Sequence, residues 1–393
     1  MFQFRADRGD LGLAGQLGLA LAHPLYITAG WLLKFIPLGK LPFWLNLFSG
    51  LGMAVALANL AAVCALLTGR RSIAAAIAAM LALAHTPWWL ATVAEVYTWS
   101  LAGFTAEVWL LVLLVRRPTW PKLLGLALIS GLGLAVHDFA LLPLPVYLIV
   151  AVVLAVRRRL PAWSLAAAAG AYLVGAGLYL GMIAAKAAEV GSLLLAVKSA
   201  LFGTYQARVL GAAPAASYQA ANLAFVGMNL INVLLPLAVV GAWVLKRRLG
   251  PMLAWPIWAL AAIQVVFAGR YFVPDQFTFF LPSYAMLAVL AAVGMQALIR
   301  RGAAWRGAVW AAWAASLVLM PVLYGLAPSL ARRLVPSAVQ RERELPFRDE
   351  ARYWLTPWKH NEDSAERFAR AALEQVKPDA VILAEPTPHY ALA

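Results

Sequence analysis

The sequence predicts an all-helical polytopic membrane protein with about ten transmembrane helices. Of its 393 residues, 63% are hydrophobic and only 12% are charged, whereas soluble domains are about 25% charged. Apolar runs of roughly 18–25 residues recur along most of the chain, and each is long enough to cross a hydrocarbon core of ~30 Å. Short clusters of arginine and lysine separate many of these runs.

Residues 1–42 are predicted to form a first loop outside the membrane, with short interfacial helices. The apolar stretch Leu11–Ala22 is too short to span a bilayer and suits an interfacial or re-entrant helix. An extracytoplasmic N-terminus with no signal peptide has two explanations. Either an upstream helix precedes this segment, which would make eleven, or the short N-terminus crosses unaided; we favour the upstream helix.

Residues 43–327 are predicted to form the transmembrane bundle. The ten expected spans are roughly 43–68, 73–91, 95–115, 122–138, 140–156, 162–183, 224–245, 251–270, 277–299 and 305–327. Five basic clusters lie between spans, at 70–71, 116–122, 157–159, 246–248 and 300–306. Placing all five in the cytoplasm satisfies the positive-inside rule and gives a consistent alternation of loops.

The acidic residues support a functional outer face. Only seven acids precede residue 330, and in this topology six of them fall in outer loops or at outer helix ends; Glu107 alone is mid-helix. A pump or proton relay would place its acids near the midplane of the membrane. The sequence therefore favours chemistry at one membrane surface.

Residues 328–393 are predicted to form a soluble extracytoplasmic tail, either complete or truncated. Asp363 or Ser364 can cap a helix through about Gln375. A strand-like segment, Ala380–Ala384, follows. One helix and one strand cannot bury a core, so we expect a small α/β unit docked on the membrane part.

The net charge of +15 does not indicate a nucleic-acid-binding protein, because the basic residues occupy loops between spans instead of one soluble face. The single cysteine, Cys64, lies in an apolar run, so no disulfide framework is expected. No H-x-E or HExxH spacing indicates a metal site. Metal dependence stays open.

Asp7 and Asp10 are the first candidate site residues. They can be solvated charges of a terminus. Alternatively, Asp7 can act as a general base toward an incoming hydroxyl, while the second acid raises its pKa or orients the acceptor.

Glu95 and Tyr97 enter the bilayer together after two tryptophans. An acid at a helix start and an interfacial aromatic belt are the alternative explanations there.

Two later outer turns carry further candidates. His137 sits before two prolines, where a lone histidine is more often structural than a ligand. Arg270 and Asp275 flank a short turn that leads into an aromatic girdle. An arginine there can bind a lipid phosphate, because guanidinium matches phosphate bidentately.

Five short motifs in order carry a family resemblance. They are Asp7-x-Gly9-Asp10, Ala22–Tyr26, Asn46–Gly50, Ala94–Tyr97 and Tyr271–Gln276 with Phe280–Tyr284 after it. Together with His137, this order resembles uncharacterised bacterial membrane proteins whose family includes the animal transmembrane protein O-mannosyltransferases. The resemblance covers roughly residues 5–390. Asp10 stands where the family usually has Glu, and the segment His23–Tyr26 is contracted.

The resemblance implies a GT-C type glycosyltransferase of the cell membrane with its active site on the extracytoplasmic face. The donor would be a polyprenyl-phosphate-linked, mannose-like sugar, and the acceptor a hydroxyl of a protein, lipid or glycan. We expect an inverting displacement with Asp7 as general base and Asp10 beside it. Arg270 is the first choice and Arg8 the second to stabilise the leaving phosphate. The remaining substrate-binding residues would be His23, Tyr26, Glu95, Tyr97, His137 and Asp275.

Two other functions stay open. A transporter or flippase for lipid-linked glycans predicts internal repeats and polar broken helices at the midplane. A non-catalytic scaffold predicts that both aspartates are replaceable. In an enzyme, Asp7, His23, Glu95, His137 and Arg270 should converge on one outer cavity, within about 15 Å of each other.

Overall fold

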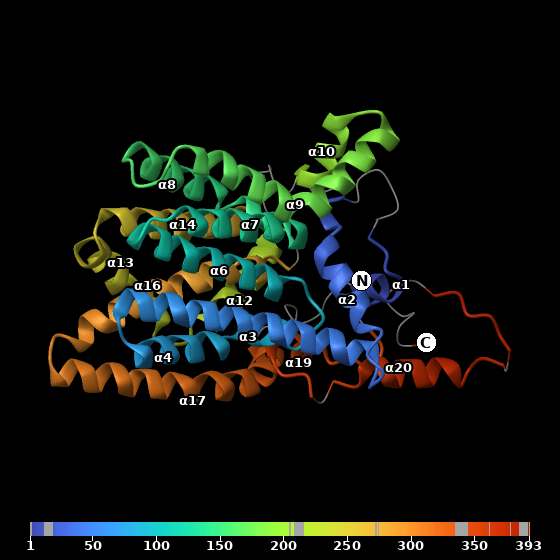
Figure 1. Cartoon of the computed structure of the whole chain (residues 1–393). Helices are drawn as coiled ribbons and strands as arrows, with labels where there is room; N and C mark the ends of the chain where they lie inside the picture. The colour runs from blue at the N-terminus through green and yellow to red at the C-terminus, as the bar shows by residue number, and fades with distance from the viewer. Residues whose placement is uncertain are drawn as a thin grey trace.

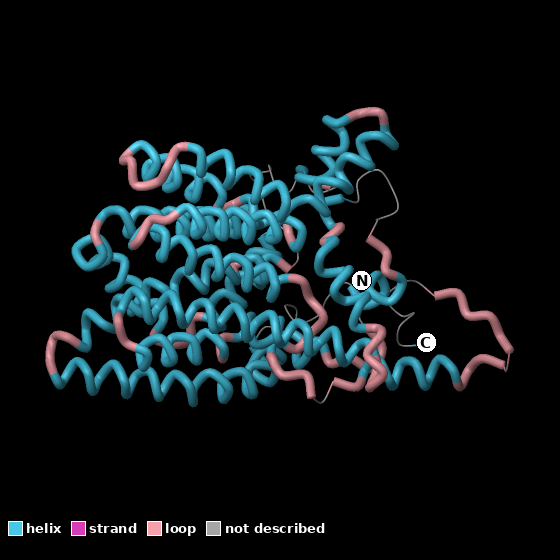
Figure 2. Tube along the Cα trace, in the orientation of Figure 1, coloured by secondary structure: helices cyan, strands magenta, loops and turns pink. Residues whose placement is uncertain are grey.

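The computed structural model describes residues 2–11, 19–203, 206–207, 216–271, 273, 275–334, 345–360, 362–377, 379–384 and 392. All regular secondary structure in these residues is helical (Figure 2). The elements are α1 (Phe2–Arg8), η1 (Leu19–Leu21), α2 (Pro24–Leu33), α3 (Leu41–Thr68), α4 (Arg71–Ala82), α5 (His85–Ala91), α6 (Tyr97–Arg116), α7 (Trp120–Val136), η2 (Asp138–Leu141), α8 (Leu144–Val156), α9 (Trp163–Val190), α10 (Leu193–Phe202), α12 (Ala216–Asn229), α13 (Leu234–Leu249), α14 (Pro251–Arg270), α15 (Gln276–Phe279), α16 (Leu281–Ile299), α17 (Ala303–Leu334), α19 (Glu350–Leu355) and α20 (Ser364–Leu373).

The prediction of an integral, multi-pass helical protein is confirmed. Among the described residues, seven helical segments are long and apolar enough to cross a membrane, or up to nine if each of two bent pairs is one span. The apolar helix α7, with 17 residues, is slightly shorter than these. Each of the ten predicted spans coincides with one of these helices or pairs.

The predicted spans 73–91 and 224–245 are not straight. The pair α4 and α5 is bent by 73°, and Asn222–Asn229 with α13 by 78°. The breaks are joined by a buried amide–threonine pair: Asn229 Oδ1 accepts from the Thr86 backbone N–H at 2.8 Å, and Asn229 Nδ2 donates to Thr86 Oγ1 at 2.8 Å. Irregular backbone is tolerated at membrane depth only where protein satisfies it in this way.

Glycines allow two helix pairs to pack with their backbones in contact. A Cβ atom added at Gly294 in α16 would overlap the Leu237 carbonyl oxygen of α13, and one at Gly241 would overlap the Leu290 carbonyl oxygen. Gly131 of α7 faces the backbone of α9 in the same manner. Small residues at such crossings are the usual means of close packing in membranes.

We therefore expect Gly294→Ala to lower the free energy of unfolding by about 1–3 kcal/mol, because a rigid backbone cannot move away from the added methyl group. The matched control is Gly307→Ala in α17, where an added Cβ meets nothing within 4 Å. Melting temperatures in detergent, followed by tryptophan fluorescence, compare the two. Equal melting temperatures would contradict this packing account.

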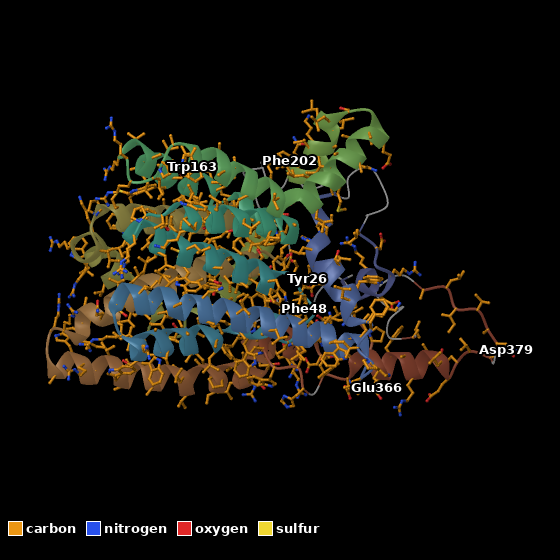
Figure 3. All side chains as sticks on the ribbon, in the orientation of Figure 1. Tyr26, Phe48, Trp163, Phe202, Glu366 and Asp379 are labelled. Atoms are coloured by element: carbon orange, nitrogen blue, oxygen red, sulfur yellow. The ribbon has the colours of Figure 1, made fainter. Side chains whose placement is uncertain are left out.

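The two ends of the bundle differ in charge. The connections after α3, α6, α8, α13 and α16, which carry the five basic clusters, lie together at the left of Figure 1. Helices α1, α2, α19 and α20 lie at the opposite end, here called the cavity end. Side chains tipped with nitrogen are accordingly frequent at the left of Figure 3. The chain thus has the alternation of loops that the basic clusters require.

The ends of the chain depart in part from expectation. Residues 12–18 of the expected interfacial helix lie outside the described residues, and Leu19–Leu21 forms a 3-10 turn. The helix expected after Asp363 is confirmed as α20. The strand expected over 380–384 is wrong: these residues form neither helix nor strand. A strand needs a neighbour to pair its backbone groups, and the described residues contain no second strand.

Candidate functional site

A polar cavity of about 370 Å³ opens at the cavity end of the bundle. Such a volume lies in the range of small-molecule sites. Its walls come from α1, α3, the turn between α5 and α6, and the tail. The lining residues are Gln3, Asn46, Thr92, Val93, Ala94, Glu95, Tyr353, Lys359 and Glu362.

The tail wall of the cavity is held by aromatic side chains of α5. The ring of Trp354 stacks on that of Trp89, with centroids 5.4 Å apart and planes 19° from parallel. Trp89 Nε1 donates to the Tyr353 carbonyl at 3.2 Å, and Thr92 Oγ1 donates to the Pro357 carbonyl at 3.0 Å. A segment more than 260 residues away in sequence therefore completes the cavity.

Glu95 is the acid that the sequence placed here, and its backbone is fixed by Ser49 of α3. Ser49 Oγ accepts from the Glu95 N–H at 3.1 Å and donates to the Glu95 carbonyl at 3.2 Å. Burial, and then the nearby charge of Asp275, raise the pKa of Glu95 to about 8. The side chain is therefore largely protonated at neutral pH and can donate a hydrogen bond.

This raised pKa gives a stability prediction with a defined sign. Between its ordinary pKa of 4.5 and about 8, Glu95 binds more protons in the folded than in the unfolded chain, so its contribution to stability is lost as pH rises through about 8. Between pH 6 and pH 9, the free energy of unfolding of the wild type should fall by on the order of 2 kcal/mol relative to that of Glu95→Gln. Melting temperatures of both proteins and of the exposed control Glu189→Gln test it. Parallel pH profiles for wild type and Glu95→Gln would refute the assignment.

His23 and His137, which were expected to line the substrate pocket, are buried side by side next to Tyr97, and neither lines the cavity. Their ring centroids are 4.8 Å apart, and the Tyr97 ring lies 5.5 Å from that of His137. His23 Nδ1 donates to the Val136 carbonyl at 2.9 Å, whereas His137 Nδ1 accepts from the Phe139 N–H at 3.2 Å. Burial lowers the pKa of His23 to about 4 and that of His137 well below its usual range, so both imidazoles are neutral.

Tyr26 lies beside this group. Its ring contacts Phe48 where α2 crosses α3, with centroids 5.6 Å apart (Figure 3). The side chain is 2% exposed. Tyr26 therefore helps to fix α2 against the bundle, and it does not line the cavity.

The N-terminal acids lie on the accessible side of α1. Asp7 is about half exposed and pairs with Lys34 of α2, with Nζ and Oδ1 3.1 Å apart. Asp10 and Arg8 are exposed. Gln3, which lines the cavity, precedes Asp7 by one helical turn, so the two share a face of α1. Asp7 thus lies near the rim of the cavity and outside its lining.

An arginine that the sequence interpretation missed fixes this segment. Arg5 is 3% exposed. Its guanidinium donates to the carbonyls of Asp10, Leu11, Leu21 and Ala22, at 2.6–3.3 Å. These bonds tie α1 to the residues that precede α2, as a five-donor fork is suited to do. Its position at the start of the charged stretch Arg5–Asp10 gave no signal of burial.

Arg270 and Asp275 bracket the last outer turn. Arg270 is exposed at the end of α14 and lines no described cavity. Asp275 precedes α15 and acts electrostatically on both Glu95 and Tyr97. The structure therefore brings His23, Tyr97, Glu95, His137 and Asp275 into one neighbourhood. Asp7 stands at its rim, while Arg8, Asp10 and Arg270 lie at the surface.

The cavity residues missed from the sequence come mostly from the tail. Tyr353 and Lys359 lie in a stretch rich in aromatic and basic residues, Tyr353–His360, which follows a mixed-charge segment, and Glu362 lies just after it. That aromatic density was the available signal for docking against a membrane domain. Among the described residues, no group of three or more His, Cys, Asp or Glu side chains could hold a metal ion.

No protein-family model and no curated protein matches this chain. Its fold is similar to that of ArnT from Cupriavidus metallidurans, whose crystal structure has undecaprenyl phosphate bound. The TM-score is 0.66 at 13% sequence identity, and the alignment covers 100% of this chain and 78% of ArnT. At this identity the likeness concerns the fold. The GT-C-like architecture expected from the sequence is confirmed by it, while the relation to O-mannosyltransferases stays a prediction.

Proposed function

We propose that this chain is a membrane glycosyltransferase that moves a hexose from a polyprenyl-phosphate donor to a hydroxyl acceptor at the cavity end of the bundle. The observation that supports it most is a polar cavity, lined by the carboxyl groups of Glu95 and Glu362, at one end of the helical bundle. It occurs in a fold similar to that of a protein that binds undecaprenyl phosphate. Carboxyl and amide groups form hydrogen bonds with sugar hydroxyls, and Glu95, Asn46 and Gln3 supply them here, with Tyr353 beside them.

The reaction we propose is a single displacement at the anomeric carbon. The acceptor oxygen forms a bond to that carbon as its bond to the phosphate oxygen breaks, and the configuration inverts. Asp7 takes the hydroxyl proton, and the polyprenyl phosphate leaves with the electron pair. Asp7 suits this role because it is accessible near the rim of the cavity and is positioned by its ion pair with Lys34.

The other predicted residues support this step in the proposal. The neutral imidazoles of His23 and His137, with Tyr97, form the wall behind Glu95 and Asp275. Arg8, the last residue of α1, and Asp10, two residues beyond it, follow the base in sequence. The leaving phosphate needs a preorganised cation. Arg270 and Arg8 are the choices from sequence, and both are exposed side chains outside the lining of the cavity.

A transporter of lipid-linked glycans is the second candidate, and the two bent helix pairs are the observation in its favour. The bends join through Asn229 and Thr86, which form a closed pair of hydrogen bonds, and charged groups are absent from that pair. The acids of the candidate site lie at one end of the bundle. This distribution favours an enzyme.

The test is sugar transfer in membranes that contain the wild-type chain, fed with radiolabelled polyprenyl-phosphate-mannose and with other polyprenyl-phosphate hexoses. We expect label to appear in acceptor material from one donor, with inverted anomeric configuration. Translocation of an unchanged donor across the membrane, with no label in any acceptor, would favour the transporter instead.

A further inference from the structure

A second cavity adjoins the first and differs from it in character. Its volume is about 340 Å³. Its walls are largely apolar residues of α3 and α5, with two basic residues from the tail. The lining residues are Phe43, Asn46, Leu47, Gly50, Ala91, Thr92, Lys359 and His360. Asn46, Thr92 and Lys359 line both cavities, so they mark the junction between them.

The second cavity continues into an apolar stripe along α3. Phe43, Leu47, Leu51 and Val55 are 59%, 41%, 52% and 42% exposed. Residues four apart lie on one side of a helix. These four side chains therefore form a path from the cavity along the membrane-facing side of α3, a predicted transmembrane span.

Lys359 is held at the junction by backbone and ring contacts. Its Nζ donates to the carbonyls of Tyr353 and Thr356, each at 2.6 Å. It also lies over two ring faces, 4.9 Å from the Tyr353 centroid and 5.7 Å from that of Trp89. These contacts fix the position of the ammonium but do not neutralise its charge, because carbonyls and aromatic rings carry no net charge. An ammonium has three N–H groups, and the two carbonyls use two of them.

No carboxylate in the described part of the chain lies within salt-bridge distance of Lys359. The nearby Arg348 is already paired with Glu350, at 2.5 Å. Of the residues that line the two cavities, Lys359 is the one with an ammonium or guanidinium group. Burial lowers the pKa of Lys359 to about 8, although the charge of Glu362, at the polar cavity, acts in the opposite direction. A bound anion would further offset the cost of burying the ammonium.

We propose that Lys359 binds the phosphate of the lipid-linked donor, with the sugar in the polar cavity and the isoprenoid chain along the α3 stripe. The order of the three parts matches the order of the ligand: polar sugar, anionic phosphate, apolar chain. The inference rests on the proposed function for the identity of the ligand. It assigns to the tail a substrate-binding role that the exposed Arg270 and Arg8 were expected to fill.

The test measures binding, which needs neither an acceptor nor turnover. The full chain in nanodiscs is titrated with undecaprenyl phosphate and with undecaprenol, its neutral counterpart, and phosphatidic acid serves as a competitor. We expect the wild type to bind the phosphate at least about tenfold more tightly than the alcohol. Excess phosphatidic acid should leave that preference in place, because a diacyl chain does not match the isoprenoid path.

Three variants then locate the preference. Lys359→Gln should reduce it to about one, Lys359→Arg should preserve it, and the exposed tail control Lys377→Gln should leave it unchanged. Unfolded protein in a preparation reduces the apparent binding of undecaprenyl phosphate and undecaprenol equally, so the ratio of the two affinities does not depend on it. Leu47→Glu, at an exposed position of the stripe, should weaken both ligands about tenfold or more, because it places a carboxylate on the path.

The inference fails if Lys359→Gln keeps the wild-type preference, if the wild type has no preference, or if Leu47→Glu binds as the wild type does. Displacement of undecaprenyl phosphate by phosphatidic acid would also overturn it, in favour of a general lipid-phosphate site. A Lys359-dependent preference in a protein that transfers no sugar would uphold this site and refute the proposed function. Sugar transfer that is unchanged in Lys359→Gln would uphold the proposed function and refute this phosphate site.

Discussion

Replacing Asp7 with asparagine is expected to lower the rate of sugar transfer by about 10²–10⁴-fold, the usual contribution of a general base. Asparagine keeps the size and the hydrogen-bonding oxygen of the side chain but cannot take up the acceptor proton. The measurement is the initial rate at saturating donor, with the melting temperature recorded in parallel. Donor binding should change little, because Asp7 lies at the rim of the cavity and outside its lining.

Lys34→Gln is the matched control for this experiment. It removes the same exposed salt bridge, which is worth at most about 1 kcal/mol, but leaves the carboxylate in place. We expect it to retain transfer within about tenfold of the wild type. If Asp7→Asn is as active as the wild type, Asp7 is not the base, and Asp10 and then Glu95 become the candidates. Equal losses in both variants would indicate a structural role for the ion pair.

Trp354→Ala is expected to release the tail from the bundle and to reduce transfer by about 10- to 100-fold. The ring stacks on Trp89, and its Nε1 donates to Glu350 Oε2 at 2.8 Å. Truncation of a buried tryptophan to alanine lowers the free energy of unfolding by about 3–5 kcal/mol. Because Trp354 is half-buried, its truncation should lower it by about 2 kcal/mol. Loss of docking would move Lys359 and Tyr353 away from the cavity that they line.

Limited trypsin digestion measures the docking separately from activity. Cleavage after Arg352, in α19, should accelerate in Trp354→Ala and should not in Trp243→Ala, a control at a 78% exposed tryptophan of α13. Unchanged proteolysis together with full activity would show that the stack with Trp89 is dispensable. Faster cleavage with unchanged transfer would separate the tail from the function and would contradict the role given to it.

The bundle could be predicted from the sequence because a bilayer leaves few alternatives. Backbone groups in hydrocarbon must be paired within the segment, so long apolar runs become helices. The helix α20 was predictable too, because Asp363 and Ser364 offer a local start signal. The two bends were not, because the contact between Asn229 and Thr86 links positions 143 residues apart. The strand at 380–384 failed because a strand depends on a partner that local composition cannot supply.

The candidate site was predictable where local signals and order along the chain sufficed. His23, Glu95, Tyr97 and His137 each stand at the end of an apolar run, and helices that alternate in direction bring such ends together. The tail was expected to dock on the membrane part, but its contacts with the cavity could not be foreseen, because Trp89 and Thr92 meet Tyr353 and Pro357 across more than 260 residues. Arg5 was missed for a related reason: its four carbonyl partners lie 5–17 residues away in sequence.

The central claim is that the chain itself transfers sugar from a lipid-linked donor. The most direct measurement uses purified wild-type protein in detergent, where no membrane separates two compartments and transport has no meaning. It follows label from the donor and the appearance of free polyprenyl phosphate. The account predicts one polyprenyl phosphate released for each sugar transferred, at a rate that Asp7→Asn lowers by about 10²–10⁴-fold. A donor that stays intact with every acceptor class supplied would contradict it.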